Sequence, residues 1–186
     1  MVRHSIPRLL ALVIALSCLT SFGAGARAQD DATETWEAEF FPISVTYNSD
    51  LWSGRSTSSF EGNVRMQLSS RATAFTLQAF NNDELDGATC LSTYLETIEE
   101  IEEVSNMEEV EDGEMPIGLR GADEMLVSYD FLWPGREEPV AMIQYLSCQE
   151  IEPGSLLLIG LETRAGIYEE EIEIMNAILD GVEIDA

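Results

Sequence analysis

Two apolar runs decide the fold: Val140-Ala-Met-Ile-Gln-Tyr-Leu-Ser-Cys148 and Ser155-Leu-Leu-Leu-Ile-Gly-Leu-Glu-Thr163. Neither run alternates cleanly between apolar and polar side chains, which is typical of strands that are covered on both faces. Between the runs, Pro153 fixes its own φ, and Gly154 tolerates the positive φ that a type II turn requires. The two runs therefore predict an antiparallel hairpin in the middle of a sheet.

Weaker patterns on either side of this hairpin predict further strands and two helices. The expected strands are 43–47, 64–69, 75–79, 107–111 and 125–133. Apolar residues at spacings of three and four predict one helix from an N-cap at Thr89 to about Val104. The same spacing predicts a second helix from Tyr168 to Leu179, which Gly181 ends, whereas the polar segment 53–63 is interpreted as a loop.

The order of these elements predicts the fold class. Strands, a helix, more strands and a final helix favour an α+β fold, with a mainly antiparallel β-sheet and two principal helices packed against it. We expect a flexible acidic lead-in at residues 29–40 and a single domain at residues 41–186.

Residues 1–28 have the features of a secretory signal peptide. Arg3 and Arg8 precede an apolar run, and small residues at Ala26 and Ala28 predict cleavage after Ala28. The run is too short to span a bilayer, and no later segment is long and apolar enough to do so. Cys18 offers an alternative, lipid anchoring, but Leu16 occupies a position where lipoprotein signals prefer a small residue. We therefore favour a secreted or periplasmic protein.

Only Cys90 and Cys148 remain after this cleavage. An even pair in an oxidising compartment predicts one disulfide, which closes a loop of 59 residues (148 minus 90 plus 1). A redox-active pair is more usually spaced Cys-x-x-Cys, so a structural bridge is favoured.

The charge of the processed chain is strongly negative. All 35 acidic residues follow Ala28, three of the nine arginines precede it, and lysine is absent, which leaves six positive and 35 negative side chains, or about −29. Such a chain repels phosphate backbones and anionic headgroups, so nucleic-acid binding is excluded and cationic partners or divalent ions are favoured. Arg120, Arg136 and Arg164 are each expected to pair with a carboxylate.

Missing side chains exclude several kinds of catalysis. The single histidine, His4, lies in the expected signal peptide, so no histidine remains for a catalytic triad or for zinc. Without lysine there is neither a Schiff base nor a phosphate loop of the Walker type. Carboxylate chemistry remains, but carboxylates are so frequent that pairs at any spacing arise by chance.

Two groups of residues are candidate sites. Aromatic residues at strand spacing could line a ligand groove, although such residues more often form core: Trp52, Tyr129, Phe131 and Trp133. Oxygen-bearing side chains alternate at Asn82, Glu84 and Asp86, as at the start of a calcium loop. The twelfth position is Thr93 rather than glutamate, so a turn that leads into a helix is favoured over a metal site.

Residues 96–114 form an acidic run, in which ten of nineteen residues are acidic and none is basic. A solvated face is favoured for this run over a specific cation site.

The segment Val45-Thr-Tyr-Asn-Ser-Asp-Leu-Trp52 is similar to a Tyr-Pro-x-x-Trp turn that follows the opening strand in the PsbP-like superfamily. Here Asn48 replaces the proline, and the tryptophan comes one residue later. The final helix, with Arg164 before Tyr168, also resembles the ending of that family. The resemblance covers most of residues 40–184 and implies a sheet flanked by helices with a binding or assembly role. It carries over no functional residue.

Together these observations predict a monomeric, non-catalytic binding or assembly module of the cell envelope, with a protein partner or small ligand that is cationic. Two alternatives remain. A carboxylate-dependent hydrolase would need two carboxylates about 5–10 Å apart in a cleft. A divalent-cation-binding acidic protein would use calcium as its cofactor.

The signal sequence yields the first prediction. Mass spectrometry of the exported protein is expected to give a chain that begins at Gln29, because the small residues at 26 and 28 fit signal peptidase. A chain that begins at Cys18 and carries acyl groups would instead establish a lipoprotein.

Overall fold

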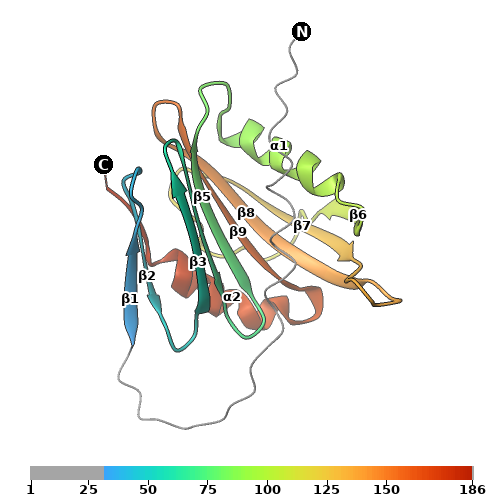
Figure 1. Ribbon diagram of the computed structural model, residues 1–186. Coiled ribbons are helices and arrows are strands. Elements are labelled where there is room, and N and C mark those ends of the chain that lie inside the picture. Colours follow the sequence, from blue (N-terminus) through green and yellow to red (C-terminus); the bar gives the residue numbers. More distant parts are fainter. Residues whose placement is uncertain (1–31, 186) are drawn as a thin grey trace.

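The computed structural model describes residues 32–185 (Figure 1). The expected signal peptide, residues 1–28, lies outside this range. Neither helix in the described range combines the length and the apolar character that a bilayer crossing requires.

The described residues form two antiparallel sheets and two α-helices, which confirms the α+β class. The larger sheet has seven strands in the order β3-β4-β5-β9-β8-β7-β6, and the smaller has three in the order β1-β2-β10. The elements are β1 (Thr33–Glu37), β2 (Ile43–Asn48), β3 (Ser53–Phe60), β4 (Asn63–Ser69), β5 (Ala74–Asn81), α1 (Gly87–Glu99), β6 (Val104–Glu109), β7 (Asp123–Phe131), β8 (Val140–Glu152), β9 (Ser155–Arg164), the 3₁₀ turn η2 (Ala165–Ile167), α2 (Tyr168–Leu179) and β10 (Val182–Ile184).

Strands β8 and β9 form the predicted central hairpin. Their register continues to Glu152 opposite Ser155, so the turn consists of Pro153 and Gly154 alone, and Gly154 has a φ of 75°. Both faces of the hairpin are covered: Leu146 packs into the core on one face, and Tyr145 packs into the core on the other. The absence of clean alternation in the two runs is therefore a consequence of burial on both sides.

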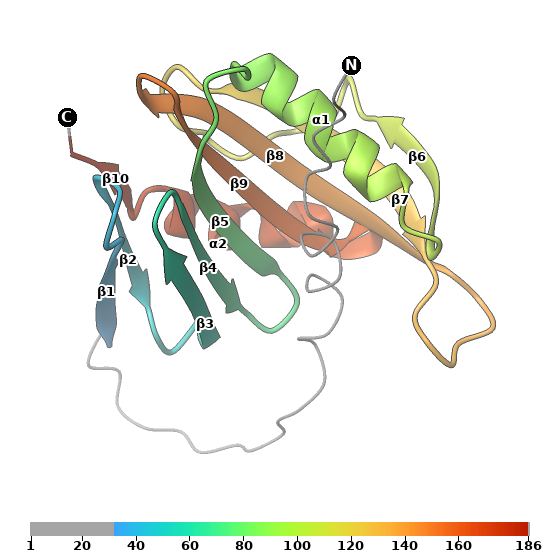
Figure 2. The ribbon, with the colours of Figure 1, turned by 45° about the horizontal axis from the view of Figure 1, so that its top comes forward.

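The two helices cover opposite faces of the large sheet (Figure 2). Helix α1 packs across β7, β8 and β9 through Leu91 and its neighbours, whereas α2 lies on the other face together with β2 of the small sheet. The core on the α2 side is the larger of the two and includes Ile172, Met175 and Leu179. The molecule is thus built as α1, the seven-stranded sheet, and a third layer made of α2 and the small sheet.

A disulfide joins α1 to the central hairpin. Cys90, in the first turn of α1, is bonded to Cys148 of β8, and their Cα atoms are 6.4 Å apart. Both cysteines are buried, at 3% and 0% exposure. The predicted pairing therefore fixes the start of α1 on the sheet.

Two segments that were expected to be irregular are strands. Residues 53–63 were predicted to be a loop, yet Ser53–Phe60 pairs with β4 as an edge strand. All of its side chains are exposed, so no apolar alternation marks it in the sequence. Within the expected flexible lead-in at 29–40, Thr33–Glu37 pairs with β2, and Trp36 packs against the core.

Helix α1 begins earlier and ends earlier than predicted. Its N-cap is Asp86, whose carboxylate accepts a hydrogen bond from the Thr89 backbone N–H, so the predicted cap is already inside the helix. The helix stops at Glu99, and Val104 belongs to β6. Helix α2 contains the whole predicted apolar stripe and ends before Gly181, as expected. Strand β10 follows Gly181, at which a Cβ would collide with the Thr46 carbonyl oxygen.

The disulfide is expected to stabilise the folded protein by restricting the unfolded chain. Replacing both cysteines, Cys90→Ala with Cys148→Ala, is expected to lower the free energy of unfolding by about 4 kcal/mol, because the closed loop has 59 residues in the unfolded chain. Urea unfolding followed by circular dichroism measures the change. A loss below about 1 kcal/mol would show that the bridge does not restrict the unfolded state as the loop length requires.

Candidate functional site

A groove lies on the α2 side of the large sheet, between the β6–β7 loop and the start of α2. Its volume is about 510 Å³, within the range of small-molecule and side-chain binding sites. Its floor is formed by Leu126 of β7 and Ile143 of β8, and Asp112, Gly113 and Glu114 line it from the loop. The residues that line it from η2 and α2 are Ala165, Gly166, Ile167, Tyr168, Glu169 and Glu170.

Three hydrogen bonds hold the β6–β7 loop in place. The Val110 N–H donates to the Leu126 carbonyl at 2.8 Å, where the loop leaves β6. The Tyr168 hydroxyl donates to the Glu114 carbonyl at 2.6 Å, and the Ile117 N–H donates to Asn176 Oδ1 at 2.7 Å. The last two bonds join the loop to α2, so the two walls of the groove are fixed to each other.

The groove is acidic on both walls. Asp112 and Glu114 stand on the loop side, Glu169 and Glu170 stand on the helix side, and no basic residue lines it. The glutamates in the first turn of α2 interact favourably with the helix dipole, which explains their position, since no side chain caps this helix. Burial and the nearby Glu114 charge raise the pKa of Tyr168 to about 12, so its hydroxyl stays protonated and can keep donating to the loop.

The four aromatic residues of the candidate ligand groove do not all lie on one face of the large sheet. Trp52 is 2% exposed, in the core on the α2 side, where it makes an edge contact with Phe75. Tyr129 is buried on the α1 side. Phe131 and Trp133 contact each other at the end of β7, with ring centroids 4.8 Å apart. Because Phe131 packs against the same α1-side cluster as Tyr129, the structure separates only Trp52 from the other three.

Two of the three side chains considered as the start of a calcium loop, Asn82 and Asp86, accept hydrogen bonds in a turn and a helix cap. Asn82 Oδ1 accepts from the Glu84 N–H, and Asp86 caps α1. The hydrogen bonds from Thr89 lower the pKa of Asp86. Within residues 32–185, no three acidic, histidine or cysteine side chains converge as metal ligands.

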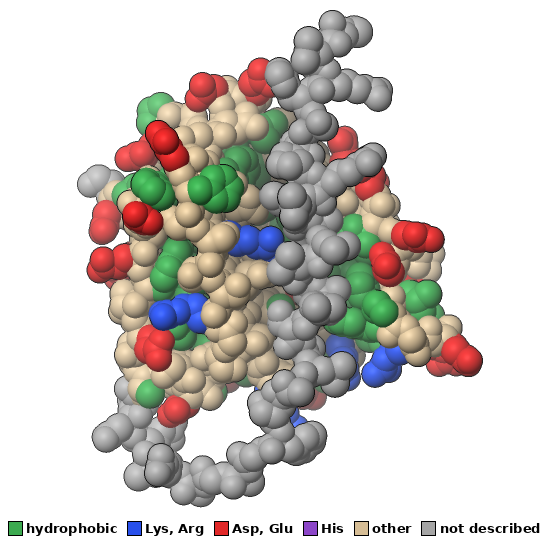
Figure 3. All heavy atoms as spheres, in the orientation of Figure 1, with side chains coloured by type: hydrophobic (Ala, Val, Ile, Leu, Met, Phe, Trp, Pro, Cys, Tyr) green, Lys and Arg blue, Asp and Glu red, His purple; other side chains and the backbone are tan. Residues whose placement is uncertain are grey.

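The arginines are mostly unpaired, contrary to expectation. Among the described residues, the only ion pair joins Arg55 to Glu34 at 3.6 Å, so Arg120, Arg136 and Arg164 have no carboxylate partner. On the face drawn in Figure 3, acidic side chains lie mostly around the outline, whereas arginines lie both among uncharged side chains further in and near the lower right edge. Exposed ion pairs contribute little to stability, so nothing compels these side chains to meet.

Sequence reasoning missed the groove and a second polar feature, a buried pair formed by Gln144 and Glu162. Both residues were visible as polar exceptions inside the two apolar runs. They are 2% and 9% exposed and lie on the α1 face of the central hairpin. The groove had no such signal, because its walls come from loop and helix residues more than fifty positions apart.

Comparisons with known proteins concern the fold. No protein-family model matches the sequence, and no curated protein is significantly similar to it. The solution structure of cyanobacterial PsbP (CyanoP) from Synechocystis sp. PCC 6803 is similar with a TM-score of 0.48 and 9% identity, over 88% of this chain and 98% of that one. This likeness to one PsbP structure is weak.

Two other solved structures are similar to a lesser degree. LpqN of Mycobacterium tuberculosis, described as involved in cell envelope biogenesis, has a TM-score of 0.41 and 12% identity over 86% of this chain and 82% of its own. A structure from Bacteroides thetaiotaomicron has a TM-score of 0.43 and 15% identity, over 78% of this chain and 46% of that one.

The hydrogen bond that joins the groove walls can be tested directly. Tyr168→Phe removes the donor to the Glu114 carbonyl and is expected to lower the free energy of unfolding by about 1 kcal/mol. Urea unfolding measures this loss, and Thr35→Val, which removes an exposed hydroxyl contact with Thr46, is the control. Equal changes in the two variants would show that the Tyr168 bond is not specifically stabilising.

Proposed function

We propose that this chain is a non-catalytic binding module of the cell envelope, which captures a cationic side chain or amine of a partner in the groove between the β6–β7 loop and α2. The observation that carries the proposal is the composition of the groove. Carboxylates stand on both walls above an apolar floor of Leu126 and Ile143, and no positive side chain is present to neutralise them.

A lysine or arginine side chain has the matching chemistry. Its methylene stem would lie on the apolar floor, and its charged head would meet the carboxylates at the rim. The fixed walls support the same reading, because a preformed groove loses less conformational entropy when it binds. The tyrosine and asparagine bonds to the loop provide this rigidity.

The charge of the whole chain adds a long-range component. A processed chain of about −29 would attract cations toward every part of its surface and accelerate encounter at low salt. Specific capture then depends on the groove, where the charges are concentrated around an apolar surface. Export supports the envelope as the location, through the signal sequence and the disulfide.

Binding of a cationic peptide tests this function. A short peptide of alternating lysine and leucine, titrated by calorimetry, is expected to bind at low salt and to bind less tightly as salt is raised. The double substitution Glu169→Gln with Glu170→Gln is expected to weaken binding roughly 2- to 30-fold, the sum of two rim interactions.

The matched control removes the same charge elsewhere. Glu102→Gln with Glu103→Gln alters two exposed carboxylates between α1 and β6, outside the groove, and is expected to leave the affinity within about twofold. Equal weakening by both double variants would show that the peptide binds the general acidic surface, and the groove would lose its proposed role.

A further inference from the structure

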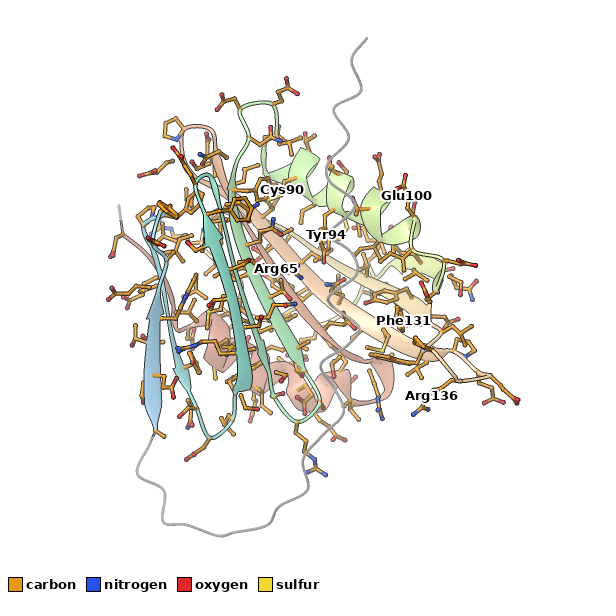
Figure 4. All side chains as sticks on the ribbon, viewed as in Figure 1. Arg65, Cys90, Tyr94, Glu100, Phe131 and Arg136 are labelled. Carbon is orange, nitrogen blue, oxygen red and sulfur yellow. A yellow bond between two sulfur atoms is a disulfide. The ribbon has the colours of Figure 1, made fainter. Side chains whose placement is uncertain are left out.

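Gln144 and Glu162 face each other across the central hairpin. They are direct partners in the β8–β9 register, so their Cβ atoms are about 5 Å apart on the same face. That face is covered by α1, and Tyr94 of α1 lies between the helix and the sheet above it (Figure 4). The two polar side chains are therefore enclosed between strand and helix.

The pair is incompletely hydrogen-bonded. Tyr129 of β7 donates to Glu162, and the Gln144 amide donates to the Tyr94 hydroxyl. Glu162 Oε2 and Gln144 Oε1 have no partner among the described residues. Each of these two cross-strand neighbours thus has one buried acceptor that receives no hydrogen bond, which is costly in a buried site.

Within residues 32–185, no cation compensates the carboxylate. Two arginines lie on this face, Arg65 of β4 and Arg164 of β9, the latter opposite Met142 in the register. Arg65 interacts with the Tyr94 hydroxyl, and neither arginine is among the groups that act on Glu162. The residue opposite Glu162 on β5 is Ala74, which has no charge to offer. Burial therefore dominates and raises the pKa of Glu162 from its usual value near 4.5 to about 7.

We propose that Glu162 binds a proton that it donates to Gln144, and that loss of this proton loosens the second half of α1 from the sheet. A protonated carboxyl supplies the single hydrogen that the two acceptors lack, and the broad terminal torsions of both side chains allow them to align.

The helix responds unevenly because it is held at one end. The disulfide fixes Cys90 in its first turn, whereas its contact with the pair is made by Tyr94, one turn later. Beyond Tyr94 the helix carries Glu96 and Glu99, both exposed. An ionised Glu162 adds a third negative charge, on the sheet under the second half of α1, where the low dielectric of the interior screens it little.

The direction of the pH effect follows from the raised pKa. The folded protein holds the Glu162 proton more tightly than the unfolded chain does, so between about pH 4.5 and pH 7 the stability contributed by this group falls as pH rises. Above about pH 7 the group is ionised in both states, and the loss is complete. The proton-bound form is the closed form of α1.

Amide hydrogen exchange tests the proposal. For the wild-type protein, protection factors of residues 95–99 are expected to fall at least threefold between pH 5.5 and pH 8.5, while those around Cys90 stay constant. Glu162→Gln keeps a hydrogen donor at every pH, so its protection factors are expected to be equal at the two values. Glu61→Gln, which removes one exposed carboxylate in the turn between β3 and β4, outside the groove, is the control and is expected to behave as the wild type.

Carbon NMR of the glutamate carboxyl groups gives a second measurement that needs no stable variant. One carboxyl resonance of the wild type is expected to titrate near pH 7. If every carboxyl titrates near its usual value, a water bridges the pair and the proposal is wrong. It is equally overturned if α1 shows the same protection at both pH values, or if Glu162→Gln and Glu61→Gln behave alike.

Discussion

The structure depends on the burial of both faces of one hairpin. Tyr145, Leu146, Leu156 and Leu161 are completely buried, although they alternate between the two sides of β8 and β9. A strand with two apolar faces needs a covering layer on each, because every exposed Å² would cost about 25 cal/mol. The chain provides α1 on one side and α2 with the small sheet on the other.

Features that depend on local chemistry could be predicted from the sequence. The hairpin turn was fixed by Pro153 and Gly154, and α2 was marked by an apolar stripe that ended near Gly181. The cysteine pairing could be predicted because only two cysteines remain in the expected mature chain and export would place them in an oxidising compartment. In each case the signal and the structural element occupy the same few residues, so no knowledge of distant contacts was required.

Features that depend on distant partners could not be predicted. Strand β3, which is mostly exposed serine and threonine, is a strand because it pairs with the edge of β4. Strand β10 forms because the chain after Gly181 pairs with β2. The start of α1 was missed for a smaller reason: Asp86 and Thr89 are both good caps, and only the observed hydrogen bond distinguishes them. The groove could not be predicted because it forms only where the loop at 112–114 lies beside the start of α2, on the same face of the large sheet.

The groove and the Gln144–Glu162 pair share the central hairpin but lie on its opposite faces. Ile143 belongs to the groove floor and Gln144 to the pair, so two adjacent residues of β8 point to opposite faces of the sheet and contribute to different sites. The backbone between them is held by β7 and β9, and the surrounding core is close-packed. Because such a core resists sliding, a change in the seating of α1 is absorbed by the helix rather than passed through the strands. The hairpin therefore separates the two sites mechanically: the pH response proposed for the α1 face would leave the groove proposed as a binding surface on the other face undeformed.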